Sequence, residues 1–351
     1  MLVFADFHHE DLYESIRILI EDRMKWELYR PVGMEWYQEG FWNVFPHIDT
    51  ARQYLDLHAA DHATEEGRRR LSEGLDSISR YNEKLLDGTY LVYSPLHEKK
   101  YKAITLPLFK QKKFDIIICS MPQHLDCLLQ LRDQFQPQAK FVYQVGNNWI
   151  IPRWVPNVLS SAKGIKLRGE PNIVYYHQEF NAKAFEPDGT RFNPRTMISM
   201  THYMQEPELF FGLERALSNW TFKAYGAGNR DLSVNPPHSN IINTFKTTGF
   251  VMHIKKEGDG FGYNGFSACA AGKPLVLRKS HFRGMTIEPF LTDGETCIDI
   301  DEKPTELIID LLEKAASDYQ SWSSRVLTRF KEVVNFDKEA ENIRSFFGNL
   351  R

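Results

Sequence analysis

The chain of 351 residues carries 43 Lys and Arg against 46 Asp and Glu, which gives a formal net charge of -3 at pH 7. This balance excludes the global basic field that draws proteins onto nucleic acid, and the 42% hydrophobic content excludes an intrinsically disordered chain. The length is typical of two domains that share one cleft, and no apolar run reaches the roughly 20 residues of a membrane span.

The N-terminal residues predict a strand rather than a secretion signal. The run 2–7 is apolar and then turns acidic, whereas a signal peptide has a basic start and a longer apolar stretch. The four cysteines show no C-x-x-C spacing, which indicates buried thiols in a reducing compartment rather than a zinc site or a disulfide framework. These features predict a cytoplasmic protein.

The first half of the chain alternates apolar runs with helical patterns. Apolar residues at helical spacing follow the first strand and predict a helix that ends near Met24, before a short strand at 27–30. A further strand, helix and strand are expected at 114–119, 125–135 and 140–145. Such alternation of buried strands and helices predicts a parallel sheet with helices on both faces.

The second half repeats this alternation after a break. Residues 149–169 have the Pro and Gly content of a linker, and the turn sequence at 181–193 is the best candidate for a domain crossover. The strands expected beyond it are 196–200, 221–225, 249–254, 274–277 and 295–300, and the helices 206–216, 240–244, a segment ending at 271, and 305–316. We therefore expect an α/β protein of two doubly wound domains whose strand ends face a common crevice.

The segment 249–277 carries the clearest chemical signal. Four glycines lie between its strand and its helix, where backbone N–H groups and the helix N-terminus can hold a phosphate. Lys255 and Lys256 stand at the strand end, where they can neutralise the same anion. Strand, basic pair, glycine turn and helix together predict an anion site.

One candidate anion is a dinucleotide. Gly260-Phe-Gly-Tyr-Asn-Gly265 matches the fingerprint G-x-G-x-x-G between a strand and a helix. That fingerprint also needs an acid at the end of the next strand, and here the strand ends in Arg278-Lys279, which suits at best the 2′-phosphate of NADP. An NADP-dependent oxidoreductase therefore stays open as an alternative.

A different match starts from Asp259-Gly-Phe-Gly, which is followed by Ser267-Ala-Cys-Ala-Ala-Gly-Lys-Pro-Leu-Val. Residues 179–187, 222–229 and 292–297 then resemble, in order, an N-G-V-D-x-x-x-F-x-P segment, a strand ending in G-x-G and a D-G-x-x-G loop. Together these pieces resemble the C-terminal half of GT-B glycosyltransferases of the retaining E-x7-E type. The resemblance covers about 173–315, and before that only the β-α order agrees.

The resemblance implies a GT-B fold, in which two Rossmann-like domains face each other across a cleft. It implies an acceptor-side domain at 1–170, a nucleotide-sugar domain at 171–317, and C-terminal helices at 318–351 that pack back on the first domain. The implied enzyme moves a hexose-like sugar from a nucleotide-diphosphate sugar to a hydroxyl of a DNA base, protein or glycan. No metal is obligatory, because lysines and a helix N-terminus stabilise the leaving diphosphate. Small enzymes of this kind occur in bacteria and bacteriophages.

Roles for single residues also follow from the resemblance. Asp259 lies where the family's acidic residue touches the transferred sugar. The residues expected to bind the donor are His202, Lys256, Gly260, Phe261, Gly262, Tyr263, Asn264 and Ser267. Asn147 and Asn148 end a strand where the family often has His-Asp facing the sugar, and His124 is a further candidate on the acceptor side.

Two departures from the family pattern leave the mechanism open. Asp259 and Ser267 replace the two Glu of the motif, and the second of these binds the donor ribose in the family. If the reaction inverts, a general base is needed near the acceptor hydroxyl, and His8 and His9 after the first strand are the preferred candidates. The loss of the second Glu also leaves open a non-catalytic module that binds a nucleotide or sugar.

Overall fold

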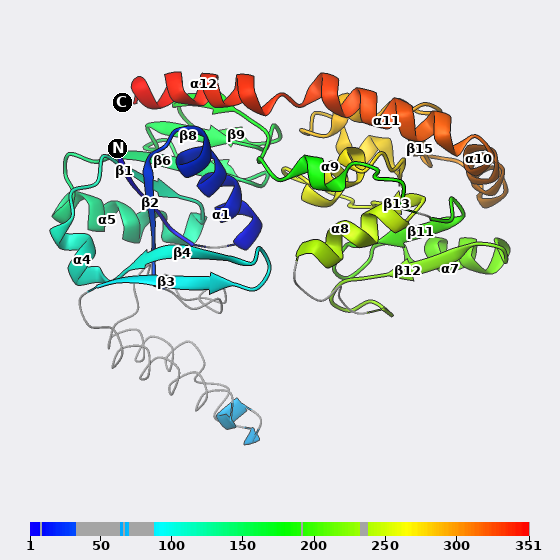
Figure 1. Cartoon of the computed structure of the whole chain (residues 1–351), viewed down its shortest axis with the longest axis horizontal. Coiled ribbons are helices and arrows are strands. Elements are labelled where there is room, and N and C mark those ends of the chain that lie inside the picture. The colour runs from blue at the N-terminus through cyan, green and yellow to red at the C-terminus, as the bar shows by residue number, and fades with distance from the viewer. Residues whose placement is uncertain are drawn as a thin grey trace.

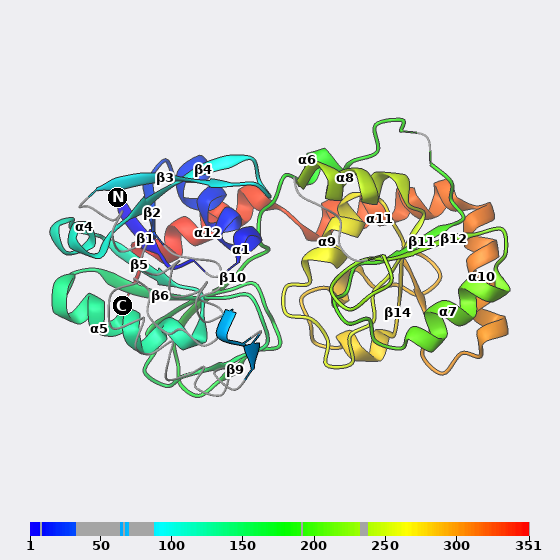
Figure 2. The same ribbon diagram turned by 90° about the horizontal axis from the view of Figure 1, so that it is seen from below.

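The computed structural model describes residues 1–7, 9–32, 64–65, 67–69, 88–190, 192–231 and 238–350. These residues form two α/β domains, each around its own sheet, which lie side by side along the long axis of the molecule (Figures 1 and 2). The prediction of two doubly wound domains is confirmed.

The first domain is built around an eight-stranded sheet in the order β10-β8-β6-β5-β1-β2-β4-β3. The strands are β1 (Leu2–Ala5), β2 (Glu27–Pro31), β3 (Thr89–Ser94), β4 (Lys99–Ile104), β5 (Ile116–Cys119), β6 (Lys140–Val145), β8 (Asn157–Ser160) and β10 (Asn172–Tyr175). Its helical segments are α1 (Glu10–Arg17) with its π-helical continuation η1 (Ile18–Arg23), α4 (Leu106–Gln111), η4 (Pro122–His124) and α5 (Leu125–Phe135). Only the β3–β4 pair is antiparallel among the described pairs of this sheet.

Two features of this domain differ from the prediction. The expected linker 149–169 contains β8, which is fully buried between β6 and β10, as well as a small separate sheet of β7 (Ile150–Ile151) and β9 (Lys166–Leu167). The β3–β4 hairpin was not expected, because β4 begins with lysines and β3 alternates between exposed and half-buried positions at the sheet edge. Edge strands carry too little apolar signal to be read from sequence alone.

The second domain has a five-stranded parallel sheet in the order β12-β11-β13-β14-β15. The strands are β11 (Thr196–Ser199), β12 (Thr221–Ala224), β13 (Phe250–Met252), β14 (Leu275–Leu277) and β15 (Cys297–Asp299). The helices are α6 (Ala182–Phe185), α7 (Pro207–Ala216), α8 (His238–Thr247), α9 (Tyr263–Ala270), η5 (Lys279–Phe282), η6 (Glu288–Phe290), α10 (Thr305–Ser317) and α11 (Tyr319–Val333). Separate apolar cores lie on the two faces of the sheet, one under α9 and α11 and one under α7 and α10.

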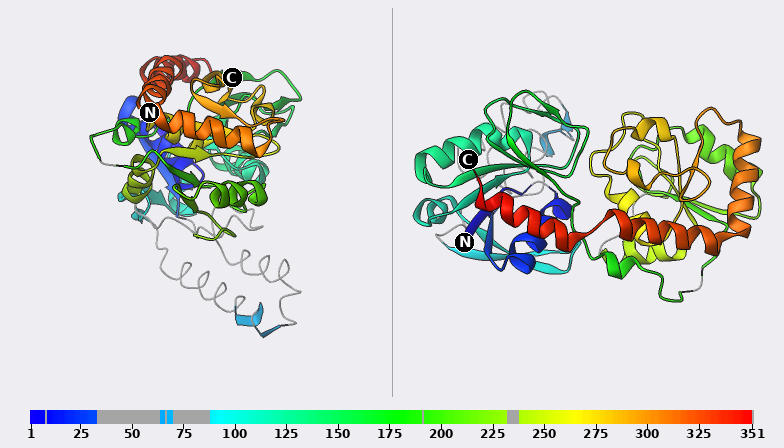
Figure 3. Two further views of the ribbon diagram at one scale, coloured as in Figure 1. Left: turned by 90° about the vertical axis from the view of Figure 1, so that its right-hand side faces the viewer. Right: turned by 90° about the horizontal axis from the view of Figure 1, so that it is seen from above.

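The chain crosses between the domains twice. Because β10 is the edge strand of the first sheet, the first crossing follows it, between the boundary expected at 170 and the turn sequence expected at 181–193. The second crossing joins α11 to α12 (Phe336–Gly348), and the two helices span both domains (Figures 1 and 3). Of the segment 318–351, α11 packs on the second domain and α12 alone packs on the core of the first.

Arg23 forms ion pairs with both segments that cross between the domains. Its Nη2 donates to Oε1 of Glu179 on the first crossing at 2.6 Å, and its Nη1 donates to Oδ1 of Asp337 at the start of α12 at 2.5 Å. In the part of the chain that the structure describes, no helix is both long and apolar enough to cross a membrane.

A buried carboxylate joins α1 to β4 and gives a first testable prediction. Glu14 accepts from Arg17 Nε at 2.8 Å, Lys99 Nζ at 2.5 Å and Tyr101 Oη at 3.0 Å. Burial opposes ionisation of this carboxyl, but Arg17 and Lys99 outweigh it and lower its pKa. Glu14→Gln should therefore cost about 2–3 kcal/mol of unfolding free energy at pH 7, since it leaves buried donors poorly paired.

Urea denaturation measures this difference in unfolding free energy. The matched control is Glu27→Gln at an exposed position, whose unfolding free energy should lie within about 0.5 kcal/mol of that of wild type. A lowered pKa stabilises the fold above the ordinary pKa of 4.5, and the benefit is lost as pH falls through the folded pKa. The gap between wild type and Glu14→Gln should therefore shrink below about pH 4. A gap that is constant with pH would show that the charge of Glu14 contributes nothing.

Candidate functional site

Two neighbouring cavities lie between the domains, where several strands of both sheets end. The larger measures about 420 Å³ and is lined by residues that follow β1, β11, β12 and β13. The smaller measures about 200 Å³ and lies between the ends of β1 and β6 and the start of α9. His9, Asp11 and Tyr263 line both cavities, which therefore form one cleft.

Asp259 is the carboxylate of this cleft on the side of the second domain. Its Oδ1 accepts from Lys255 Nζ at 2.9 Å, and its Oδ2 lies 3.2 Å from Nε2 of the buried His253. Burial opposes ionisation of Asp259, but His253 and Lys255 outweigh it and lower its pKa to about 2. The cleft thus contains a carboxylate that is ionised at any working pH.

The glycine turn after β13 lies directly against the first domain. Phe261 N donates to Gly146 O at 3.0 Å, and a Cβ on Gly260 would lie 2.4 Å from both Gly146 O and Asn147 Cα. Gly262 has a φ of +76° and is the N-cap of α9, so the first amides of that helix open onto the cleft. The first amides of such a helix can hold an anion, which is the role that the sequence analysis expects of this turn.

The basic groups of the cleft differ in part from the expectation. Lys255 lines the larger cavity, whereas the Lys256 side chain is exposed and does not line it, and its backbone N donates to Gln205 Oε1 at 2.7 Å. The sequence predicted Lys256 at this anion site, but Lys255 is the lysine that lines the cavity, because the chain turns away from the cleft between these two residues.

His202 lines the same cavity from the end of β11. Its Nδ1 accepts from Ala227 N at 2.8 Å, which assigns the ring proton to Nε2 when the imidazole is neutral. A neutral His202 can then donate a hydrogen bond from Nε2 to a bound oxygen atom.

The chain resembles solved structures in fold, at sequence identities of about one residue in ten. No protein-family model matches it, and neither does any curated protein. HepE of Anabaena, solved with UDP and glucose, matches with a TM-score of 0.62 and 8% identity over 99% of both chains. A glycosyltransferase from Rickettsia africae matches with a TM-score of 0.60 and 10% identity over 99% of this chain and 97% of its own. The pneumococcal O-GlcNAc transferase GtfA, solved with UDP and GlcNAc, matches with a TM-score of 0.52 and 10% identity over 76% of this chain and 66% of its own.

The chain has the GT-B fold. Its glycine turn, Asp259 and Lys255 lie in the second of the two GT-B domains, at the wall that faces the first. Tyr263 and Asn264 line this wall as expected, and Asn264 Nδ2 donates to Met200 O at 3.0 Å, which joins α9 to the end of β11.

Phe261 lines the smaller cavity, and its ring stacks on that of the buried Phe266 at 4.2 Å between ring centroids. Two other predicted residues of the GT-B cleft lie elsewhere than expected. Ser267 is fully buried in α9 and lines neither cavity, because its side chain is much shorter than the Glu of the family motif. Asn148 Nδ2 donates to Met285 Sδ at 3.1 Å, so this amide bridges the domains rather than facing the cavity.

On the first-domain side, His9 and Asn147 line the GT-B cleft. The His9 side chain caps α1 by accepting from Asp11 N at 3.3 Å and is 59% exposed, so it is open to solvent and ligand. The prediction for His8 falls outside the described residues.

His124 does not reach the cleft. It is buried, and its Nδ1 lies 2.9 Å from Oδ2 of Asp6, which also accepts from the backbone N of Ser120 at 2.6 Å and of Met121 at 3.3 Å. The predicted acceptor role is corrected to a structural one: the short turn η4 brings His124 inward, where it fixes the loop after β5 together with Asp6.

A network of polar groups across the cleft was missed by the sequence analysis. Asp11 Oδ1 lies 3.2 Å from His97 Nε2, the His97 ring lies 5.2 Å from that of His238, and His238 Nε2 lies 2.9 Å from Tyr263 Oη. Burial opposes ionisation of Asp11, but the three histidines His97, His9 and His238 outweigh it and lower its pKa. The network connects the β3–β4 hairpin with α9.

Within the described residues, no group of three His, Cys, Asp or Glu side chains is placed to hold a metal ion.

Proposed function

We propose that the chain is a metal-independent glycosyltransferase that transfers a hexose from a UDP-sugar to an acceptor bound on the first-domain side of the cleft. The observation that carries this proposal is the contact of Asp259 with Lys255 beside the free amides of α9, at the interdomain wall. The similar HepE and GtfA structures were solved with UDP. A cytoplasmic location in a bacterium or a phage-infected cell fits the same proposal.

The residues of the cleft divide the chemistry between them. Lys255, the amides at the start of α9 and Nε2 of His202 hold the leaving diphosphate and stabilise the negative charge that it gains. Asp259 stabilises the positive charge that develops on the sugar ring, because it is ionised and points into the same cavity. His9 and Asn147 face the acceptor, Asn147 as a hydrogen-bonding amide and His9 as a base once its Nδ1 is released from the weak bond with Asp11 N at 3.3 Å.

An observation at the end of β14 argues against an NADP site. The Arg278 guanidinium, which would bind the 2′-phosphate, donates to both carboxylate oxygens of Glu206 at 2.7 Å. A guanidinium that donates to a carboxylate in this bidentate way has few N–H groups available for a phosphate.

The proposal is tested by following UDP release from UDP-glucose and UDP-GlcNAc without an acceptor. Slow release from at least one of them is the expected result, since water can replace the acceptor in a glycosyltransferase. Binding without release would point to the non-catalytic module instead. Saturable binding of NADPH that is tighter than that of UDP would favour the oxidoreductase.

The contrast between two adjacent lysines gives a second prediction. Lys255→Met should weaken UDP binding by about 10- to 150-fold, because it removes a charge-assisted hydrogen bond worth roughly 1.5–3 kcal/mol. Lys256→Met is the matched control. Its affinity for UDP should stay within about twofold of that of wild type, since the Lys256 side chain is exposed to solvent.

Calorimetric titration with UDP and with uridine measures both effects. Uridine lacks the phosphates, so its affinity should be the same in both variants. Equal losses for UDP and uridine in Lys255→Met would mean that Lys255 supports the fold of the site rather than the diphosphate.

A further inference from the structure

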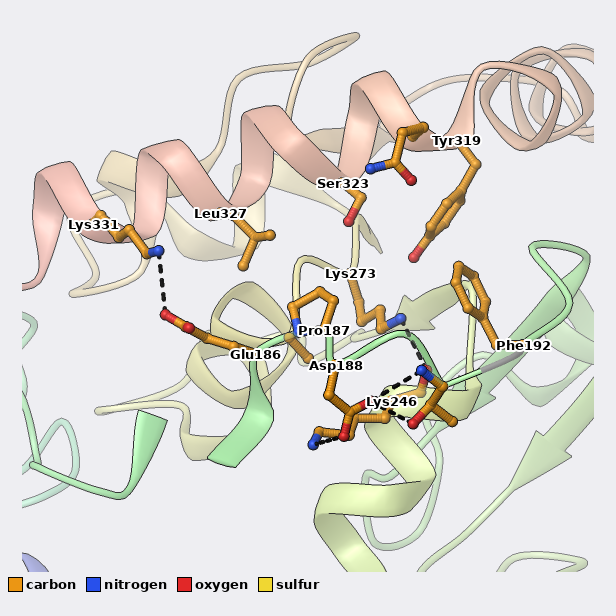
Figure 4. Close-up of a pocket in the computed structure, with 13 residues that line it drawn as sticks. Glu186, Pro187, Asp188, Phe192, Lys246, Lys273, Tyr319, Ser323, Leu327 and Lys331 are labelled. Atoms are coloured by element: carbon orange, nitrogen blue, oxygen red, sulfur yellow. Dashed lines mark hydrogen bonds and ion pairs between the residues drawn. The ribbon is translucent and has the colours of Figure 1, made fainter. Parts of the chain in front are cut away.

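A separate cavity of about 250 Å³ lies in the second domain, away from the cleft (Figure 4). Its walls are α11, the end of α8, and residues 186–190 and Phe192, which follow the first crossing. Glu186 on that segment pairs with Lys331 on α11 at 3.2 Å, so a ligand here would touch both segments that connect the domains. None of the groups in the proposed reaction lines this cavity.

Lys273 is the unusual residue of this cavity. Only 2% of its surface is exposed to solvent. Its Nζ donates to the backbone O of Lys246, near the end of α8, at 3.2 Å. The same Nζ lies 4.2 Å from the centroid of Phe192 and 5.8 Å from that of Tyr319. An ammonium has three donors, so two of them lack a hydrogen-bond acceptor among the described residues.

The carboxylates that line the cavity do not neutralise Lys273. Asp188 pairs with Lys246 at 2.7 Å, and Glu186 pairs with Lys331. Lys273 has no carboxylate within 4.0 Å in the described part of the chain. Burial lowers the pKa of Lys273 to about 8, so the amine is still mostly protonated at pH 7.

We propose that this cavity binds a small organic oxyanion, a carboxylate or phosphate on an apolar body. The oxyanion would pair with Lys273 and accept from its two remaining donors, which offsets the cost of burying an uncompensated ammonium. The apolar body would lie against Phe192, Tyr319 and Leu327, the apolar part of the wall. The proposed ligand site is thus distinct from the donor cleft and lies in the second domain, between α11 and the residues that follow the first crossing.

Calorimetric titration at pH 7 tests the site with benzoate, phenyl phosphate and neutral benzamide. The anions should bind and benzamide should not, and whichever anion binds more tightly identifies the carboxylate or the phosphate as the preferred group. Lys273→Met should weaken anion binding at least tenfold. Lys255→Met, which alters the donor cleft, should leave anion binding at the Lys273 cavity unchanged. The outcome of this titration is therefore independent of whether the proposed transferase activity is found.

A second variant and a pH series keep the test independent of folding defects in Lys273→Met. Leu327→Trp retains the amine but fills the cavity, and should abolish binding as well. In wild type, benzoate affinity should fall on the order of tenfold between pH 7 and pH 9, with proton uptake on binding near pH 8, because only the protonated amine pairs with the anion.

Loss of binding in both variants, together with the fall at high pH, would support the site. Equal affinity in wild type and Lys273→Met would overturn it, and so would the absence of saturable binding for both anions.

Discussion

Asp259→Asn should lower the rate of UDP release from the donor sugar by about 100- to 1,000-fold. The change keeps the shape of the side chain but removes the charge, and a preorganised charge or donor in an active site contributes about 2.7–4 kcal/mol to the transition state. Donor affinity should change by less than about fivefold, since the carboxylate acts mainly as charge develops on the sugar. A fall in kcat at nearly constant KM is therefore the expected result.

Steady-state kinetics with the accepted UDP-sugar measure this effect, and the exposed Asp293→Asn serves as the control. Because the pKa of Asp259 is lowered to about 2, its titration should not shape the pH profile of the wild type above about pH 4. An unchanged kcat in Asp259→Asn would reduce this residue to a structural partner of Lys255 and His253.

Two of the strands that the sequence predicts correctly are buried on both faces. Ile116–Cys119 and Lys140–Val145 form runs of apolar residues because helices cover both sides of the sheet there. The short β8 also lies in the interior, but its four residues stand among prolines and glycines and resemble a loop. Burial of such a strand depends on its neighbours β6 and β10, which local sequence does not reveal.

In the candidate site too, the sequence predicts features whose residues are close in sequence and misses contacts between residues that are far apart in sequence. Asp259 and the glycine turn are close in sequence, and their position between strand and helix predicts the anion site directly. The contact between Asp11 and His97, by contrast, joins segments that are far apart in the chain. His253 directly follows β13 and precedes the glycine turn, so its position was a signal that could have identified it as a partner of Asp259.

Backbone direction explains the placement of Lys256 and His124. Both Lys255 and Lys256 follow β13, and only the turn of the chain decides which side chain enters the cavity. His124 follows β5 in the same way, but the short η4 brings it to Asp6 in the interior. The rule that functional residues follow strand ends places candidates near the cleft, and the conformation of each loop then selects among them.

Gly260→Ala should weaken UDP binding by on the order of 10- to 100-fold and reduce UDP release at least as much. The new Cβ would meet Gly146 O and Asn147 Cα at 2.4 Å, and these are backbone atoms that cannot rotate away. Overpacking of this kind costs about 1–3 kcal/mol, and here the strain is relieved when the two domains separate. Separation would also break the hydrogen bond from Phe261 N to Gly146 O that closes the cleft.

The matched control is Gly212→Ala in α7, where the added Cβ meets only an arginine side chain at 4.0 Å. This change should leave UDP binding unaltered and stabilise the fold by about 0.5–1 kcal/mol, because alanine favours a helix interior over glycine. Both domains have cores of their own, so circular dichroism should show intact secondary structure in Gly260→Ala. If Gly260→Ala bound UDP as tightly as wild type, contact between the glycine turn and the first domain would play no part in donor binding, and the donor would be held by the second domain alone.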